Sequence, residues 1–149
     1  MMRMICVVSL IALVGCQQKS VREADAPAGA LFAWVRFETA VIDQKPIDLA
    51  IIPIPGCSAC AHEFLSNYSL LRSRSFIVVV SCSDNVVLRA VAKKHKISLD
   101  SLIVDNQQWM YRNDFVDEYP VLYRLSENRI LRKEVVEGAN FYHLIESWP

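Results

Sequence analysis

The sequence predicts an α/β fold in which a mixed sheet carries helices on both faces. From residue 49 onward, short apolar runs alternate with segments of helical periodicity, a pattern typical of parallel strands joined by right-handed crossovers. Residues 76–80 (Phe-Ile-Val-Val-Val) are a continuous apolar run, which favours a strand buried on both faces. Two further strand-like runs near the end of the chain flank a short turn and predict an antiparallel hairpin.

Residues 31–42 fit two interpretations, a strand and a helix. Every second side chain from Val35 to Val41 is apolar or β-branched, as in a half-buried strand, whereas Leu31 and Trp34 also fit one face of a helix. We favour the strand and therefore expect a strand-rich start to the domain.

Residues 49–54 (Leu-Ala-Ile-Ile-Pro-Ile) predict a buried strand. We expect this strand to end near Pro53 and Pro55, because a proline cannot donate a hydrogen bond to a central ladder. Gly56 then permits a tight turn. Apolar side chains at helical spacing over residues 61–71 predict the helix that follows.

The remaining elements continue the alternation. Asn85 is a candidate cap for a helix that ends in a basic run at residues 93–96. Cations oppose the dipole at a helix end, so we interpret this run as a helix terminus rather than a binding patch. The other expected elements are a turn at 81–84, a short strand at 102–104, a loop with one or two helical turns at 109–119, hairpin strands at 121–125 and 130–136, a break at Gly138 and a last helix at 140–147.

Cys57 and Cys60 form a Cys-x-x-Cys pair at the junction between the predicted strand and helix. Two thiols at this spacing can close a small disulfide ring, and the positive field of a helix start favours the thiolate of Cys57. These properties suit thiol–disulfide exchange, in which Cys57 attacks a substrate disulfide and Cys60 then closes the intramolecular bond. Ser58 is a candidate hydrogen-bond donor to the Cys57 sulfur.

The amino terminus has the three-part pattern of a secretory signal. Arg3 supplies a positive charge, and the apolar core at residues 5–14 is too short for a comfortable membrane span. Leu13-Val14-Gly15-Cys16 resembles the lipobox of bacterial lipoproteins. This resemblance implies cleavage before Cys16, a lipid on Cys16 and an extracytoplasmic protein anchored to a bacterial membrane, on the periplasmic side if the cell is Gram-negative. An ordinary signal peptide or an uncleaved anchor is the alternative.

The expected organisation is therefore a lipoprotein signal peptide at residues 1–15, a lipidated tether at 16–29 and one domain at 30–149. Residues 17–29 are polar, with Ala, Pro and Gly and almost no large apolar side chain, as in a flexible linker.

The chain has five cysteines. Cys6 would leave with the signal peptide and Cys16 would carry the lipid, so the folded part would keep Cys57, Cys60 and Cys82. We interpret these as one redox pair and one further thiol. Free cysteine is among the most buried residue types, so Cys82 is expected to be structural rather than a third redox cysteine.

Composition limits the classes of partner. The chain has 16 basic and 16 acidic residues, so there is no electrostatic argument for a nucleic-acid partner, nor a basic tract for an anionic membrane surface.

The order of elements resembles the thioredoxin fold, and more closely the TlpA-like, membrane-anchored thiol–disulfide oxidoreductases. The resemblance spans about residues 49–148. It depends on the cysteine pair at a strand–helix junction, on Glu63 three residues after the second cysteine, on Tyr119-Pro120 directly before the hairpin and on Gly138 at its end.

This resemblance implies a thioredoxin-like mixed sheet and an enzyme that exchanges thiols and disulfides with protein substrates, more plausibly by reduction. It implies that Pro120 follows a cis peptide bond beside the disulfide, that Tyr119 and Pro120 bind an extended substrate, and that Glu63 supports the chemistry. A membrane or periplasmic protein would donate the electrons. We expect neither a cofactor nor a metal.

The sequence departs from the family at two places. Pro55-Gly56 stands where an aromatic residue usually precedes the first cysteine, and residues 49–54 contain no acid that could serve as the buried carboxylate. Asp48 lies too early. His62 follows Cys60 by two residues, and on a helix it would project away from that cysteine.

Two other functions therefore stay open. One is a non-catalytic thioredoxin-like binding module whose disulfide is structural. The other is a copper- or zinc-handling protein that uses Cys57, Cys60 and a histidine.

Overall fold

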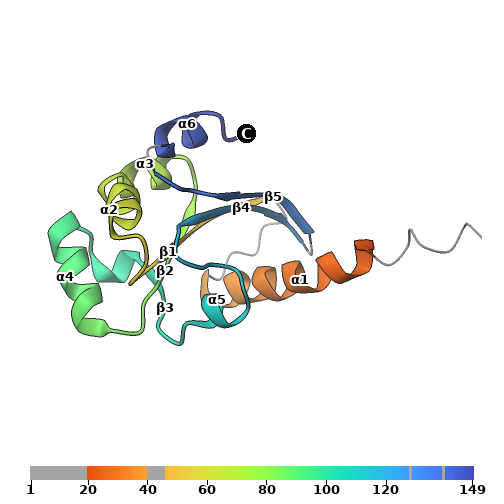
Figure 1. Ribbon diagram of the computed structural model, residues 1–149, viewed down its shortest axis with the longest axis horizontal. Coiled ribbons are helices and arrows are strands. Elements are labelled where there is room, and N and C mark those ends of the chain that lie inside the picture. Colours follow the sequence, from red (N-terminus) through yellow and green to blue (C-terminus); the bar gives the residue numbers. More distant parts are fainter. Residues whose placement is uncertain (1–19, 40–45, 128, 139) are drawn as a thin grey trace, which may run out of the picture.

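The computed structural model describes residues 20–39, 46–127, 129–138 and 140–149, and its centre is a five-stranded mixed sheet (Figure 1). The strand order is β3-β2-β1-β4-β5. β1 (Ile47–Pro53) pairs in parallel with β2 (Ile77–Ser81), which pairs in parallel with β3 (Ile103–Asp105). On its other edge β1 pairs antiparallel with β4 (Val121–Ser126), and β4 forms the predicted hairpin with β5 (Arg129–Val135). The strand that leads into the cysteine motif is therefore the central one.

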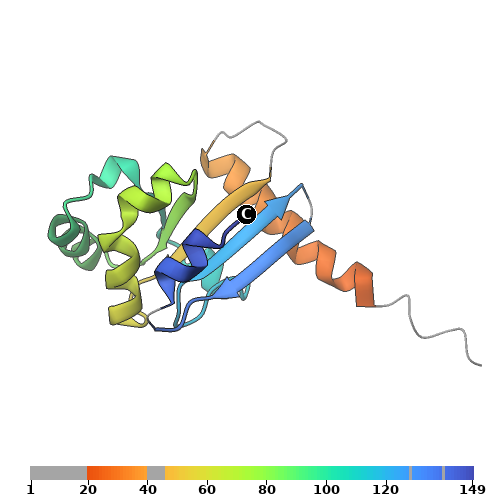
Figure 2. The same cartoon turned by 90° about the horizontal axis from the view of Figure 1, so that it is seen from above.

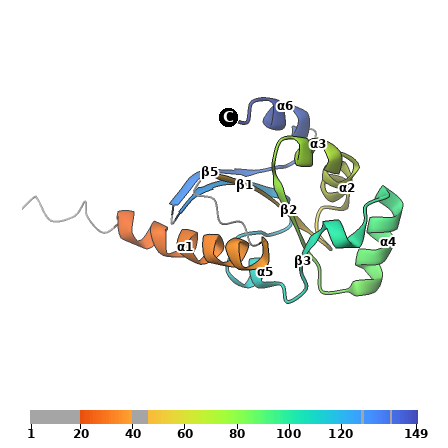
Figure 3. The same cartoon turned by 180° about the vertical axis from the view of Figure 1, so that it is seen from behind.

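Helices cover both faces of this sheet. In Figure 2 α6 lies in front of the strands and α1 behind them, and Figure 3 shows α1 and α5 together on the side away from α6. The helices that pack on the α6 side are α2 (Ser58–Ser66), α3 (Tyr68–Ser73), α4 (Asn85–His95) and α6 (Phe141–Glu146). The helices on the other side are α1 (Ser20–Thr39) and α5 (Trp109–Arg112). A short 3₁₀ turn, η1 (Leu99–Ser101), precedes β3.

Consecutive side chains of β1 enter two separate cores. Ala50 and Ile52 pack with α2, α3 and α6, whereas Leu49 and Ile51 pack with α1 and α5. This alternation is the period of a strand, and burial on both faces explains why residues 49–52 contain no polar side chain. The topology confirms the predicted thioredoxin-like α/β fold, a mixed sheet with helices on both faces.

The predicted strand at residues 31–42 is wrong, because this segment belongs to helix α1. Ala28, Leu31, Phe32 and Val35 are all buried at helical spacing. Phe37, which the strand interpretation placed on the same face as Val35, is 85% exposed. Packing of the helical stripe against the sheet outweighs the local alternation. Residues 40–42 lie outside the described residues.

Helix α1 also includes part of the predicted tether at residues 16–29. The chain is helical from Ser20, so part of the segment that composition assigned to a flexible linker is the start of α1. Ala28 already packs in the core. Within the ranges that the structure describes, neither α1 nor any other helix combines the length and hydrophobicity that a bilayer crossing requires.

Two helix boundaries differ from the predicted ones. The helix after the motif begins at Ser58 rather than at residue 61, and it divides at Asn67, whose side-chain amide donates to the Glu63 carbonyl (2.9 Å). Asp84, not Asn85, caps α4 by accepting from the N–H groups of Val86 (2.8 Å) and Val87 (3.2 Å).

Candidate active site

Cys57 and Cys60 are joined by a disulfide where β1 gives way to α2. Their Cα atoms are 5.3 Å apart, which is within the usual range for a disulfide. Cys57 is the N-cap residue of α2 and is partly exposed, whereas Cys60 lies in the first turn and is 4% exposed. The pair therefore has one accessible sulfur and one protected sulfur.

The start of α2 provides a donor for the Cys57 sulfur. The Cys60 N–H lies 3.4 Å from Cys57 Sγ and donates to it. After reduction, this contact and the helix dipole would stabilise a thiolate at Cys57. Ser58 was expected to donate as well, but no hydrogen bond joins its hydroxyl to Cys57 within the described ranges. The Cys60 N–H makes this contact instead, and the Ser58 side chain is exposed.

The loop before β4 lies against the motif. The Cys57 N–H donates to the Glu118 carbonyl oxygen at 2.7 Å, and the Tyr111 hydroxyl donates to the Pro55 carbonyl oxygen at 3.3 Å. Tyr119 is half-buried and Pro120 is buried. The structure thus brings the Tyr119-Pro120 segment close to the cysteines, as the resemblance implies.

The peptide bond between Tyr119 and Pro120 is not cis, which corrects the geometry that the resemblance implies. Within the described ranges the one cis bond lies between Ile54 and Pro55. A trans bond is favoured by about 0.5–1 kcal/mol before any proline, unless tertiary contacts select the other isomer.

Gly56 is required by a close approach of two backbone segments. A Cβ atom at this position would lie 2.6 Å from the Glu118 carbonyl oxygen and 3.0 Å from Pro53 Cγ. The first of these is a backbone atom that also accepts from Cys57. A side chain at Gly56 would therefore push the loop away from the motif.

Gly56→Ala is accordingly expected to lower the free energy of unfolding by about 1–3 kcal/mol and to slow disulfide exchange, because overpacking displaces the Glu118 carbonyl. Urea denaturation and exchange rates with a small disulfide measure the two effects. Gly138→Ala is the matched control, since a Cβ there has open space and only the positive φ of 70° opposes it. Exchange at the wild-type rate in Gly56→Ala would contradict the assigned contact.

Glu63 and His62 lie on α2 beyond the cysteines. Glu63 is half-buried, and its carbonyl oxygen accepts from Asn67; a supporting role for its side chain stays a prediction. His62 Nδ1 lies 3.1 Å from His95 Nε2 on α4. The side chain thus pairs across the helices rather than with Cys60.

The acids near the motif come from the loop rather than from β1. Asp48 lies at the opposite end of β1, where its carboxylate accepts from Trp148 Nε1 (2.7 Å) and lies 3.8 Å from Arg124. Burial, and then the charges of Asp117 and Glu118, raise the pKa of Tyr111. Neither acid is among the site residues that the sequence predicts, although their position directly before Tyr119-Pro120 is a signal for it.

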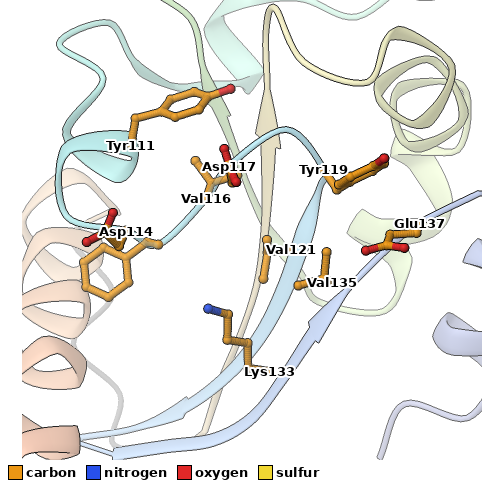
Figure 4. A pocket seen from close by; sticks show the side chains of 10 residues that line it. Tyr111, Asp114, Val116, Asp117, Tyr119, Val121, Lys133, Val135 and Glu137 are labelled. Atoms are coloured by element: carbon orange, nitrogen blue, oxygen red, sulfur yellow. The ribbon is translucent and has the colours of Figure 1, made fainter.

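A hollow of about 520 Å³ extends from Tyr119 along β4 and β5. Figure 4 shows Tyr111, Asp117 and Tyr119 around it, with Lys133 reaching in from β5. Of the two residues predicted to bind substrate, Tyr119 lines this hollow and Pro120 does not.

Cys82 is a free, fully buried thiol directly after β2. Its sulfur donates to the Asp84 carbonyl oxygen (3.3 Å), and burial raises the pKa of the thiol. Both features fit the expected structural role. Among the described residues, no three histidine, cysteine or acidic side chains are grouped to hold a metal ion.

Known proteins similar to this chain were found among solved structures. A protein from Chlorobium tepidum described as thiol:disulfide interchange protein DsbE is 14% identical, with 69% of this chain and 77% of that one covered and a TM-score of 0.49. StoA from Bacillus subtilis is 18% identical, with 70% and 82% covered and a TM-score of 0.49. A thiol:disulfide interchange protein from Bacteroides sp. is 17% identical, with 70% and 73% covered and a TM-score of 0.45. No family model matches the chain, and no curated protein matches it significantly. Structural similarity at this sequence identity and TM-score assigns no activity to this chain.

Proposed function

We propose that the protein is an extracytoplasmic thiol–disulfide oxidoreductase that reduces disulfides of protein substrates through Cys57 and Cys60. The observation that carries this proposal is the geometry of the pair, with a partly exposed sulfur at a helix start bonded to a buried one. An accessible, stabilised first thiolate and a protected second thiol are what two-step exchange requires.

The reaction begins with both cysteines reduced. The Cys57 thiolate attacks one sulfur of the substrate disulfide, and the other substrate sulfur leaves as a thiolate. Cys60 then loses its proton and attacks Cys57 Sγ, which releases the second substrate thiolate and closes the Cys57–Cys60 bond. Two electrons pass from the enzyme pair to the substrate. A membrane or periplasmic electron-donor protein then reduces the pair by the same exchange.

Other residues have supporting roles in this proposal. Tyr119, which lines the hollow of Figure 4, binds the substrate polypeptide together with the adjacent Pro120. Ser58, which is exposed, and Glu63, which is half-buried, tune the environment of the pair from α2. No cofactor takes part.

The location follows from the amino terminus. Cleavage before Cys16 and lipid attachment to Cys16 would anchor the domain to a bacterial membrane, facing away from the cytoplasm. The pattern Leu13-Val14-Gly15-Cys16 supports this part of the proposal. These residues lie outside the described ranges. Each buried lipid methylene contributes about 0.8 kcal/mol to anchoring.

A structural disulfide in a non-catalytic module is the second candidate. It is favoured by β1, which holds no acid beside the motif, and by Asp48, which is engaged with Trp148 and Arg124. A buried proton acceptor for Cys60 is therefore not provided by the central strand.

The reduction potential separates the two candidates. The full chain, purified in mild detergent and equilibrated with thiol–disulfide buffers, is expected to have a potential between about −270 and −120 mV, the span of known exchange proteins. It is also expected to reduce insulin catalytically. A potential below about −300 mV without turnover would instead identify a structural disulfide.

A further inference from the structure

A second groove, of about 250 Å³, lies between α2 and α4 and begins at the cysteine motif. Gly56 and Ser58, the two neighbours of Cys57, line its near end. It shares no lining residue with the hollow of Figure 4. A polypeptide joined to Cys57 therefore has this groove directly beside the attachment point.

The walls of this groove are apolar. They include Ile54, Leu65 and Val91, together with Val87 at the start of α4. Val87 is 39% exposed and its neighbour Val86 is 77% exposed. Covering exposed apolar surface favours binding, so the groove favours an apolar side chain.

The far end of the groove is basic. His62, Lys94 and His95 line it, with the two imidazoles 3.1 Å apart between Nδ1 and Nε2. No acidic side chain lines the groove, and no ion pair involves Lys94 in the part of the chain that the structure describes. Burial, and then the charges of His62 and Lys94, lower the pKa of His95, which favours its neutral form, so the positive charge at this end is mainly that of Lys94. A lysine with no acid among the residues that line the groove favours an anionic group.

The spacing of residues along α2 sets the distance between the cysteine end of the groove and its basic end. Ser58 and His62 are four residues apart, which is about 6 Å along a helix axis. Two residues of an extended chain, at about 3.3 Å each, cover the same distance. A carboxylate two residues from the substrate cysteine would reach His62.

We propose that this groove binds the substrate segment next to the attacked disulfide and selects a cysteine whose neighbour is apolar and whose second neighbour on the same side is acidic. This inference rests on the proposed function, because it is the mixed disulfide with Cys57 that brings the segment to the groove. The apolar side chain occupies the space beside Val87, and the carboxylate meets Lys94 and the histidine pair.

The preference for an acidic residue is tested with two peptide disulfides. In one, the cysteine is flanked on both sides by leucine and then aspartate; in the other, lysine replaces aspartate. At low salt the full wild-type chain is expected to reduce the aspartate peptide with a kcat/KM about fivefold higher, as a partly exposed charge pair allows. Lys94→Glu is expected to abolish or reverse this preference. Lys93→Glu makes the same change of charge at an exposed neighbour outside the groove and is expected to retain it.

The preference for an apolar residue next to the cysteine is tested with Val87→Ser. This variant is expected to lower kcat/KM for the leucine–aspartate peptide several-fold but to reduce an alanine–aspartate peptide as wild type does. Val86→Ser, at the more exposed neighbour that does not line the groove, is the control and is expected to leave both values unchanged.

Reduction of hydroxyethyl disulfide by the wild-type chain separates failure of this inference from failure of the proposed function. The groove assignment is wrong if this small disulfide is reduced but the preference for the aspartate peptide is absent, or is equal in Lys94→Glu and wild type. That result would still support the proposed oxidoreductase function. If neither substrate is reduced, the proposed function fails first. A wild-type dimer that Val87→Ser dissociates, without any peptide preference, would show that a second copy occupies the groove and would overturn the inference.

Discussion

Cys57→Ser is expected to lower insulin reduction to the uncatalysed background, and Cys60→Ser is expected to trap the substrate as a stable mixed disulfide. The two variants differ because the cysteines differ in exposure: Cys57 is partly exposed at the start of α2, whereas Cys60 is 4% exposed. Only a thiolate attacks a disulfide, so serine at position 57 removes the first step. Serine at position 60 leaves that step intact and removes the resolving thiol.

The trapped species is detected by mass spectrometry of the full chain after reaction with a peptide disulfide. The mass gain expected for Cys60→Ser is that of one peptide thiol. Cys82→Ala is the control, and its turnover is expected to equal that of wild type, since the Cys82 thiol is buried and its pKa is raised. Trapping by Cys57→Ser rather than by Cys60→Ser would reverse the assigned roles, and loss of turnover in Cys82→Ala would make that thiol part of the reaction.

The strands and the motif could be predicted because their signals are local. Residues 49–54 and 76–80 are apolar without interruption, as strands buried on both faces must be, and the structure places β1 and β2 there. The cysteine spacing, together with the change from strand to helix periodicity, was enough to place the disulfide at the start of a helix.

Helix α1 could not be separated from a strand by its local pattern. The decisive observation is the joint burial of Ala28, Leu31, Phe32 and Val35 against the sheet, and that packing depends on residues far along the chain. Ala28 also fell in the segment whose composition suggested a linker. Tertiary packing thus decides between the helical period and the strand period, which fit the local sequence almost equally well.

The surroundings of the cysteines were predicted less well than the cysteines themselves. The contacts that define them join distant residues: Cys57 with Glu118, Tyr111 with Pro55, and His62 with His95. Only the family resemblance predicted that Tyr119-Pro120 lies close to the motif. It implied a cis peptide bond before Pro120, whereas that bond is not cis. Nothing in the sequence around His62 indicated a partner on α4.

Asp105 is expected to be the acidic residue whose removal destabilises the fold most. It ends β3, is 3% exposed and accepts three hydrogen bonds. These come from the Ser81 hydroxyl (2.9 Å) and from the N–H groups of Trp109 and Met110 (both 2.8 Å). One carboxylate therefore ties β2 to β3 and caps the start of α5, the helix that carries Tyr111 toward Pro55.

Asp105→Ala is expected to lower the free energy of unfolding by about 3 kcal/mol or more, because each of the three donors left without an acceptor costs about 1–3 kcal/mol. Asp105→Asn keeps the shape and one acceptor oxygen, so about half of that loss is expected. Urea denaturation measures both values. Asp100→Ala, an exposed position on η1, is the control and should change stability by less than about 0.5 kcal/mol. If Asp105→Ala lies within 1 kcal/mol of wild type, the three donors find other partners and the carboxylate does not hold α5 in place.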